Sequence, residues 1–407
     1  MNKRFLAIGM LSMPLAISNA WADDTAAGPT VTISGFGTAA MTWANTDDAQ
    51  YARYNQASGA GKKGRTGVDS NLGLQAQIGV NDWLSGTVQG LVRKDGQDDY
   101  GAELAWAFAK AKISDNFSVR AGRLGVPAFM ISEYRNVGYA NNFLRPPNEL
   151  YSQMGFSYMD GADVTYLVAV DDTNFTAQLV VGSSTQIAPS SNSTPVHLKG
   201  KHMTALNLVA EHGPLTLRFG RVDAKLSLSD SSLLNTLVAG LRTASAAVPR
   251  LGALADAIEV KDKKASFTSV GAGLDWNNIV VQTEYAKRKT DSFLNDSTSW
   301  YVMGGYRIGK FVPYYIHADL KDDGSVDNTV PAVPALRALS AGVTALTKGA
   351  AQSTDTIGLR WNFAPSADLK VQIDRVKPEN GAGLLVNAKS GFSRPVTVGA
   401  IAVDFVF

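Results

Sequence analysis

Short segments in which apolar and polar residues alternate are the feature of this sequence that most constrains its fold. In the clearest segment, five apolar residues share one side of an extended chain: Leu72, Leu74, Ala76, Ile78 and Val80. A period of two residues is the signature of a β-strand with two unlike faces. About sixteen such segments follow one another between residue 30 and residue 407, so the sequence predicts an all-β fold.

The connections between these segments indicate a barrel. Short turns such as Asn81-Asp82 and Asn277-Asn278 alternate with connections that are mostly long. Bacterial outer-membrane barrels have an even number of strands, short periplasmic turns and long extracellular loops. A soluble sandwich also alternates, but here the second face of most segments is polar. An apolar face can point to lipid only if no strand edge is open, so we predict a transmembrane antiparallel β-barrel of about sixteen strands.

The N-terminus has the three parts of a secretory signal peptide. Basic residues in Asn2-Lys3-Arg4 precede an apolar run over 5–17, and the small-residue site Ala20-Trp21-Ala22 follows. The apolar run is too short to span a membrane. We therefore expect a cleaved signal peptide, 1–22, and one mature barrel domain, 23–407, in the outer membrane of a Gram-negative bacterium.

Charge and motifs exclude several functions. Loss of Lys3 and Arg4 with the signal peptide leaves 36 of the 38 basic residues, which equals the 36 acidic residues. Nucleic-acid binding needs a basic surface, so we expect none. The four histidines are scattered, cysteine is absent, and the sequence has no H-E-x-x-H or G-x-S-x-G motif. We expect no enzyme activity, no cofactor and no metal site.

One long segment, 125–152, does not alternate. It begins with an apolar stretch, continues with charges among aromatics, and contains Pro146-Pro147. About 28 residues is long for a loop in compact β-structure, and its aromatics argue against disorder. We expect this constriction loop to fold into the barrel after the fifth strand and to narrow the channel. An ordered surface flap is the alternative.

Three other long connections interrupt the strand pattern. Residues 230–259 and 331–350 carry leucines and valines at helical spacing, so short helices are expected in two extracellular loops. These two helical insertions are expected to pack on each other over the barrel mouth. Residues 182–200 are polar, contain Pro189 and Pro195, and are expected to form a loop.

Aromatic residues near the predicted strand ends are expected to form two girdles on the lipid-facing surface. The set consists of Trp43, Trp83, Trp106, Tyr166, Trp276, Trp300, Tyr306, Trp361, Phe363 and Phe407.

Charged residues on the inner face and in the constriction loop are predicted to line the channel. They are Arg93, Arg120, Glu133, Arg135, Arg145, Glu149, Arg218, Arg307, Arg360 and Lys370. By alternation, the acidic residues Glu103, Glu211, Glu284 and Asp374 are also expected to face inward. Rings of charge set the selectivity of a pore. Arg120 directly precedes the loop, so we expect it to face Glu133 or Glu149, which would place a basic wall opposite an acidic loop. Alternatively the charges pair along the wall, or Arg135 and Arg145 favour anions.

Together these features resemble the Gram-negative general porins. The terminal alternation that ends in Phe407 is similar to the signature which that family presents to the outer-membrane assembly machinery, and segment 125–152 stands where the family has its inward-folded constriction loop. The resemblance implies a sixteen-stranded homotrimer in contact with outer-membrane lipid and lipopolysaccharide. Two features depart from the family pattern: the loop lacks a dense acidic tip, and the helical insertions are not typical.

We therefore predict an outer-membrane porin whose water-filled channel passes small hydrophilic solutes and ions by passive diffusion. The first alternative is a substrate-selective channel for small anionic metabolites on the same fold. The second is a barrel that serves as an enzyme or an adhesin. A hydrolase would need Ser, His and an acid together at one rim, and an adhesin would need no loop inside the lumen.

Overall fold

The structure, a computed structural model, describes residues 29–189, 195–324 and 326–407. The predicted signal peptide, 1–22, and the expected start of the mature chain at Asp23 lie outside the described residues.

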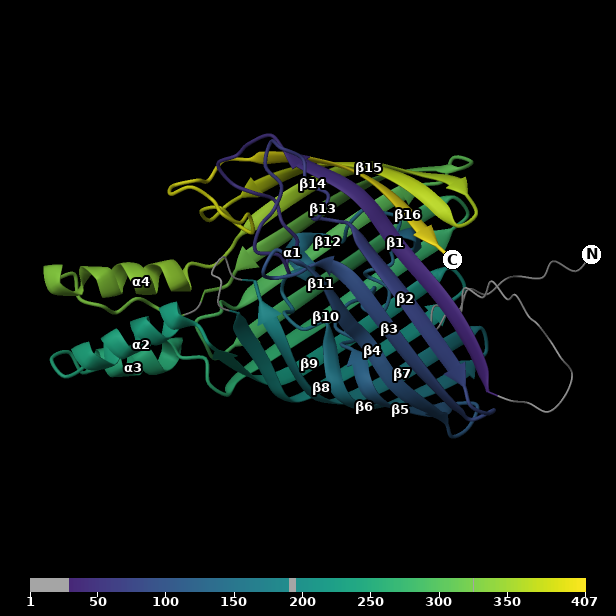
Figure 1. Cartoon of the computed structure of the whole chain (residues 1–407), viewed down its shortest axis with the longest axis horizontal. Coiled ribbons are helices and arrows are strands. Elements are labelled where there is room, and N and C mark those ends of the chain that lie inside the picture. The colour runs from purple at the N-terminus through teal and green to yellow at the C-terminus, as the bar shows by residue number, and fades with distance from the viewer. Residues whose placement is uncertain (1–28, 190–194, 325) are drawn as a thin grey trace, which may run out of the picture.

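Sixteen antiparallel strands of the described chain form a closed barrel in which each strand pairs with its sequence neighbours and β1 pairs with β16 (Figure 1). This arrangement confirms the predicted fold class. The strands are β1 (Thr30–Ala44), β2 (Asn71–Gly79), β3 (Leu84–Lys94), β4 (Tyr100–Lys112), β5 (Phe117–Gly125), β6 (Tyr158–Val170), β7 (Thr173–Ala188), β8 (Val196–His212), β9 (Leu215–Ser229), β10 (Lys263–Trp276), β11 (Ile279–Thr290), β12 (Ser297–Tyr306), β13 (Phe311–Asp322), β14 (Gln352–Ala364), β15 (Ala367–Pro378) and β16 (Val396–Val406).

Two glycines on the outer face of β1 allow the last strand to close the barrel. A Cβ atom on Gly35 would lie 2.3 Å from the ring of Phe407, and one on Gly37 would lie 2.5 Å from the ring of Phe405. The two phenylalanine rings, 6.5 Å apart, therefore lie flat over a bare stretch of backbone. The sequence pairs small residues on the first strand with large ones on the last, which favours this closing register over others.

The outer surface of the barrel is apolar, as the alternation predicted. Valine, leucine and isoleucine side chains on most strands are exposed there, Val31 and Ile33 by more than 60%. Of the predicted girdle aromatics, Trp43, Trp83, Tyr166, Trp276, Tyr306, Trp361, Phe363 and Phe407 are exposed, whereas Trp300 is only partly so.

Trp106 is the exception, because it points into the barrel. The register between β3 and β4 shifts after the pair Gln89–Trp106, so that Gly90 pairs with Leu104. One extra residue exchanges the two faces of a strand, which brings Trp106 and Phe108 to the inner side. Trp106 lines an internal cavity with Glu133, and the Arg120 guanidinium lies 5.0 Å from the Phe108 ring. The girdle prediction for Trp106 was wrong.

The prediction of a loop over 182–200 was also wrong for most of its length. Strand β7 continues to Ala188 and β8 begins at Val196, with Ser184 paired to Gly200 and Ala188 paired to Val196. In this extension β7 has four consecutive polar residues, 183–186, and β8 alternates only over the short run 196–199. A strand segment that extends beyond the lipid-facing part of a barrel needs no apolar face. Its sequence therefore lacks the regular alternation of apolar and polar residues by which strands are recognised.

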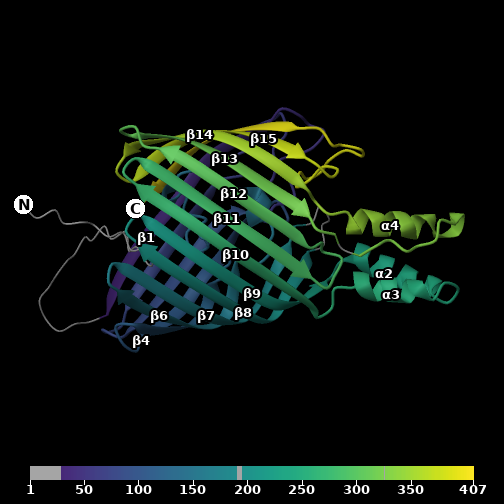
Figure 2. The ribbon, with the colours of Figure 1, turned by 180° about the vertical axis from the view of Figure 1, so that it is seen from behind.

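Three α-helices project beyond the rim at the end of the barrel where the long loops lie, opposite the end that holds the C-terminus (Figures 1 and 2). They are α2 (Ser232–Ala244), α3 (Arg250–Ile258) and α4 (Arg337–Thr347), which follows the short η2 (Pro334–Leu336). A Cβ atom on Gly240 of α2 would lie 2.7 Å from Leu339 of α4, so the two insertions pack together as expected. None of the described helices is long and apolar enough to cross a membrane.

Candidate channel constriction

The segment between β5 and β6 enters the barrel and fills part of its interior. It contains the short helices η1 (Gly138–Ala140) and α1 (Asn148–Tyr151). Its side chains Phe129, Phe143 and Tyr151 are at most 2% exposed, which is incompatible with a surface flap. The expected inward-folded constriction loop is therefore present.

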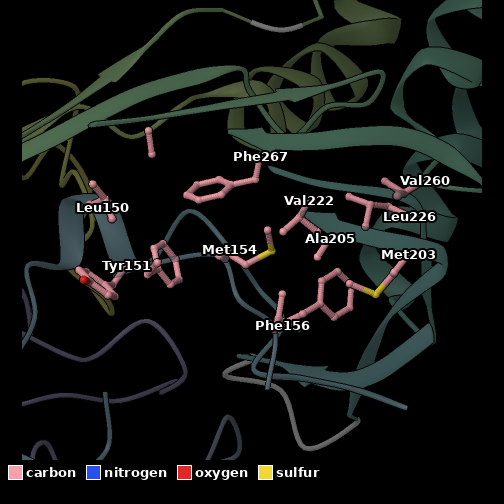
Figure 3. Close-up of a cluster of buried hydrophobic side chains, with 14 of the residues drawn as sticks. Leu150, Tyr151, Met154, Phe156, Met203, Ala205, Val222, Leu226, Val260 and Phe267 are labelled. Atoms are coloured by element: carbon pink, nitrogen blue, oxygen red, sulfur yellow. The ribbon is translucent and has the colours of Figure 1, made fainter. Parts of the chain in front are cut away.

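An apolar cluster on the inner wall holds the loop in place. In Figure 3, Met154 and Phe156, which follow the loop, lie beside Val222 and Met203 of the wall strands. The Phe129 ring lies 4.5 Å from the Tyr151 ring and 5.3 Å from the Phe267 ring. Methionine and phenylalanine at inward positions were the signal for this contact, but alternation alone does not show which inward residues meet a loop rather than water.

Wall residues of β9 and β11 bind the first part of the loop. Glu284 accepts hydrogen bonds from the backbone N–H of Met130 (2.9 Å) and from the hydroxyl groups of Tyr151 and Tyr301. Arg218 donates to the carbonyl oxygens of Pro127 and Ala128. Arg218 thus points inward as predicted, but it positions the loop backbone. Glu284 also points inward as the alternation predicts, and it too binds the loop.

The tip of the loop is tied to the opposite wall. The Lys370 ammonium of β15 donates to the Gly138 carbonyl oxygen (2.6 Å), and Arg360 of β14 donates to the Asn141 carbonyl oxygen (2.9 Å). The Tyr139 hydroxyl group donates to the carbonyl oxygen of Pro365 in the turn between β14 and β15 (2.6 Å). The loop therefore crosses the lumen from β5 to the strands that close the barrel.

Arg120 meets an acidic residue on each side. It binds Asp163 of β6 through two nitrogens, at 2.9 and 2.6 Å, and its guanidinium lies 3.6 Å from Glu133 of the loop. Nearby, Arg93 pairs with Glu103 at 2.8 Å and donates to the Asn136 side chain. Here the loop is acidic and the wall basic, as the sequence predicts, although each wall arginine also has an acidic neighbour on the wall.

Where the loop returns toward β6, the signs of the facing charges are reversed, with the basic residue on the loop. Arg145 is 2% exposed and lies 3.4 Å from Asp69 and 3.8 Å from Asp374, with its guanidinium 4.8 Å from the centre of the Tyr51 ring. None of its three side-chain nitrogens has a hydrogen-bond partner among the described residues. Here a basic residue of the loop faces acidic residues. This arrangement differs from the expected one, in which an acidic loop lies opposite a basic wall.

Glu149 is buried against β14. Its carboxylate accepts hydrogen bonds from Gln352 (2.6 Å) and from the Thr354 hydroxyl group, and the residue is 2% exposed. Burial raises the pKa of the Glu149 carboxyl above its ordinary value. Glu149 therefore holds α1 against the wall and does not face Arg120.

The first long loop, between β1 and β2, also enters the lumen. The Asn148 amide of α1 donates to the Ala52 carbonyl oxygen (2.8 Å), and the Arg135 guanidinium lies 5.5 Å from the centre of the Tyr54 ring. Arg135 is 6% exposed and forms no ion pair with a described residue. The sequence gives no sign of the contact between this loop and the constriction loop.

Arg307 lies apart from the other predicted channel residues. It follows β12, bonds Asp275 at 2.5 and 2.6 Å, and belongs to the end of the barrel where the short turns lie. It is not part of the constriction. The other nine residues lie on the loop or on the inner wall.

Comparisons in sequence give no relatives: no protein-family model and no curated protein matches the chain. Solved structures match it over nearly its whole length. OmpT, an outer membrane protein of Vibrio cholerae in trimer form, has a TM-score of 0.51 at 15% identity and covers 94% of this chain and 100% of its own. The outer membrane channel DcaP of Acinetobacter baumannii has a TM-score of 0.53 at 12% identity, covering 93% and 98%.

Salmonella typhi OmpF, solved in complex with daunomycin, has a TM-score of 0.50 at 16% identity and covers 93% of this chain and 98% of its own. The chain has the porin fold. At these identities the likeness extends to the fold alone. The sixteen strands and their closure match the architecture that the sequence resemblance implied.

Proposed function

We propose that the protein is an outer-membrane porin that passes small hydrophilic solutes and ions by passive diffusion. The observation that carries the proposal is a loop lying across the inside of a closed barrel, with charged groups of the loop facing charged groups of the wall. A barrel with an apolar exterior is suited to lipid, and its polar interior to water. The similar solved structures include a protein described as an outer membrane channel.

The charged groups of the constriction set how solutes pass. Arg120 and Glu133 on one side, and Arg145 and Asp374 on another, create local fields of opposite direction. A polar solute can align with such fields, whereas an apolar solute has to displace ordered water and passes slowly. Because most of these charges are paired, the expected ion selectivity is weak.

A channel selective for small anionic metabolites is the second candidate. It is favoured by Arg135, which has no acidic partner among the described residues, and by Arg145, whose side-chain nitrogens make no hydrogen bond to a described residue although Asp69 and Asp374 lie 3.4 and 3.8 Å away. Unpaired arginines inside a narrow passage attract anions more strongly than paired ones.

The proposal also covers how the protein reaches the outer membrane and what it contacts there. We propose export through cleavage of the signal peptide 1–22, insertion of a single barrel, 23–407, by the outer-membrane assembly machinery through the strand that ends at Phe407, and contact with lipid and lipopolysaccharide. A homotrimer is also proposed, since OmpT of Vibrio cholerae was solved in a trimer form.

Conductance in planar lipid bilayers tests the proposal. The purified mature protein is expected to form ohmic channels with weak ion selectivity. A strong anion preference, with block by small organic anions, would favour the second candidate. Absence of conductance from a folded barrel would overturn both and leave the enzyme or adhesin.

A further inference from the structure

A cavity of about 340 Å³ lies directly against the constriction loop at the end of the barrel where the long loops lie. One side of it is α1 and the residues that follow, Asn148, Ser152 and Gln153. The rest of the lining comes from five other connections between strands and the adjoining strand ends, including Arg53 of the first long loop and Leu384 between β15 and β16. The cavity therefore lies where the constriction loop meets the long loops of this end of the barrel.

Three cationic side chains line this cavity, and two of them, Arg53 and Lys348, lack partners among the described residues, whereas Arg288 donates to the Asn295 carbonyl oxygen (2.9 Å). No side-chain nitrogen of Arg53 has a hydrogen bond or an ion pair with a described residue, and its Nη2 is fully buried. Lys348 is exposed and forms no ion pair with any residue that the structure describes, so the buried donor is that of Arg53. Buried donors without partners are rare in proteins and call for a ligand or ordered water.

The acidic residues of the lining are already engaged. Asp296 accepts a hydrogen bond from the backbone N–H of Thr290 (2.8 Å), and Asp322 accepts from the Asn295 side chain (2.6 Å) and from the Gly324 N–H (3.0 Å). These bonds hold the two carboxylates in their own turns. The free hydrogen-bonding capacity of the cavity is therefore mainly that of cationic donors, which select for an anion.

Much of the remaining lining is apolar. Phe293, Leu346 and Leu384 contribute to it, together with neighbouring leucines. Pockets that retain an organic molecule combine an apolar lining with a few placed polar groups. A small inorganic anion would satisfy Arg53 but would leave the apolar wall without contacts.

We infer that this cavity binds a small organic anion in which a carboxylate is carried on an apolar body, with the carboxylate at Arg53 and the body against Phe293, Leu346 and Leu384. The site deepens the proposed function, on which its role in transport rests. Solutes of this class would be concentrated at the constriction and would pass or block the channel at lower concentration than equally small hydrophilic anions.

Isothermal titration of the folded protein in detergent tests the site without using conductance. Benzoate is the probe, acetate tests the carboxylate alone, inorganic phosphate tests an anion without a body, and benzamide tests the body alone. We expect saturable benzoate binding at least tenfold tighter than that of the other three. Equal binding of benzoate and acetate, or no saturable benzoate binding, would overturn the inference.

Variants locate the site. Arg53→Ala is expected to weaken benzoate binding roughly tenfold, because one hydrogen bond to a charged group is lost, and Arg53→Lys should restore part of it. Lys62→Ala is the matched control, since it removes a positive charge from the same loop at an exposed position away from the cavity. Equal weakening in both variants would show a general charge effect and overturn the site. The thermal unfolding of each variant checks that it is folded.

Bilayer recordings separate the two proposals. Benzoate added on the long-loop side should reduce the current through the wild-type channel more strongly than through Arg53→Ala. Benzoate binding by a barrel that carries no current would support the site and overturn the porin function. Current without benzoate binding would overturn the site and leave the porin function standing.

Discussion

Lys370 and Gly138 join the wall of the barrel to the tip of the constriction loop. The lysine ammonium donates to the glycine carbonyl oxygen at 2.6 Å and also binds Asp404 at 2.8 Å, and the side chains of both charged residues are completely buried. Gly138 lies 232 residues away from Lys370 in the sequence. The width of the passage therefore depends on a bond between the loop and the strands that close the barrel.

Substitution of this lysine should free the loop tip. In Lys370→Met the tie to Gly138 is lost and Asp404 is left buried without its cation, which costs about 3–5 kcal/mol of folding stability. We expect a lower thermal unfolding midpoint, together with larger and noisier single-channel currents.

A second variant separates the two effects of Lys370→Met. The double variant Lys370→Met with Asp404→Asn removes the unpaired carboxylate but does not restore the bond to Gly138. Folding stability should therefore recover in part, while the current noise remains. Quiet, unchanged currents in both variants would show that this bond does not hold the loop.

Arg120 should control ion selectivity through the charges that it balances. Arg120→Ala leaves Asp163 and Glu133 without their cation, so the passage becomes more negative and cations should be favoured. The measurement is the reversal potential in a salt gradient. Arg221→Ala is the matched control, because Arg221 binds Asp223 on the outer face of β9. An unchanged reversal potential would remove Arg120 from the conduction path.

Much of the barrel follows from the sequence because strand faces are set locally. A strand with Leu72, Leu74 and Ile78 on one side has one apolar face whatever its position in the barrel. Alternation therefore indicates both the strand and the side of it that faces outward. The same rule placed Arg93, Arg120 and Lys370 on the inner wall. It failed at Trp106, where a shift of one residue reversed the faces, because a bulge has no reliable signature in a single sequence.

The partners of the constriction loop could not be predicted in the same way. Arg145 lies beside Asp69 and Asp374, and Glu149 accepts a hydrogen bond from Thr354. These partners are far apart in the sequence and meet only in the closed barrel. Composition identified the loop, but the pairing of charges depends on how far the loop reaches across the lumen. The intrusion of the first long loop, through Ala52 and Tyr54, was missed for the same reason.

The buried Glu149 carboxyl should make stability depend on pH. Its pKa is raised by burial, so the folded protein holds this proton more tightly than the unfolded chain does. The contribution of the group is therefore fully present below its unfolded pKa and is lost as the pH rises through its folded pKa. Glu149→Gln removes the titration and keeps an amide oxygen as acceptor for Gln352 and Thr354.

Thermal unfolding in detergent, from about pH 4.5 to pH 7.5, measures this difference. The wild-type midpoint should fall relative to the midpoint of Glu149→Gln as the pH rises. Parallel curves for the two proteins would mean that Glu149 titrates alike in the folded and unfolded states, in contradiction to its burial.

Gly138 should tolerate no side chain, since the loop tip lies directly against the wall. A Cβ atom there would come within 2.0 Å of an Asp404 carboxylate oxygen and 2.6 Å of the Thr38 hydroxyl oxygen. Neither partner can easily withdraw, because the Thr38 hydroxyl group donates to that same carboxylate and Lys370 holds its other oxygen. Gly138→Ala should therefore push the tip off the wall at a cost of about 1–3 kcal/mol.

Gly304→Ala is the matched control for Gly138→Ala, since a Cβ atom on Gly304 meets no atom within 4 Å. Thermal unfolding should show a lower midpoint for Gly138→Ala only, and its single-channel currents should resemble those of Lys370→Met because both variants break the same contact by different means. A Gly138→Ala protein with the midpoint and current of the wild type would place the tip away from Asp404, and the passage would then be wider than the tie to Lys370 allows.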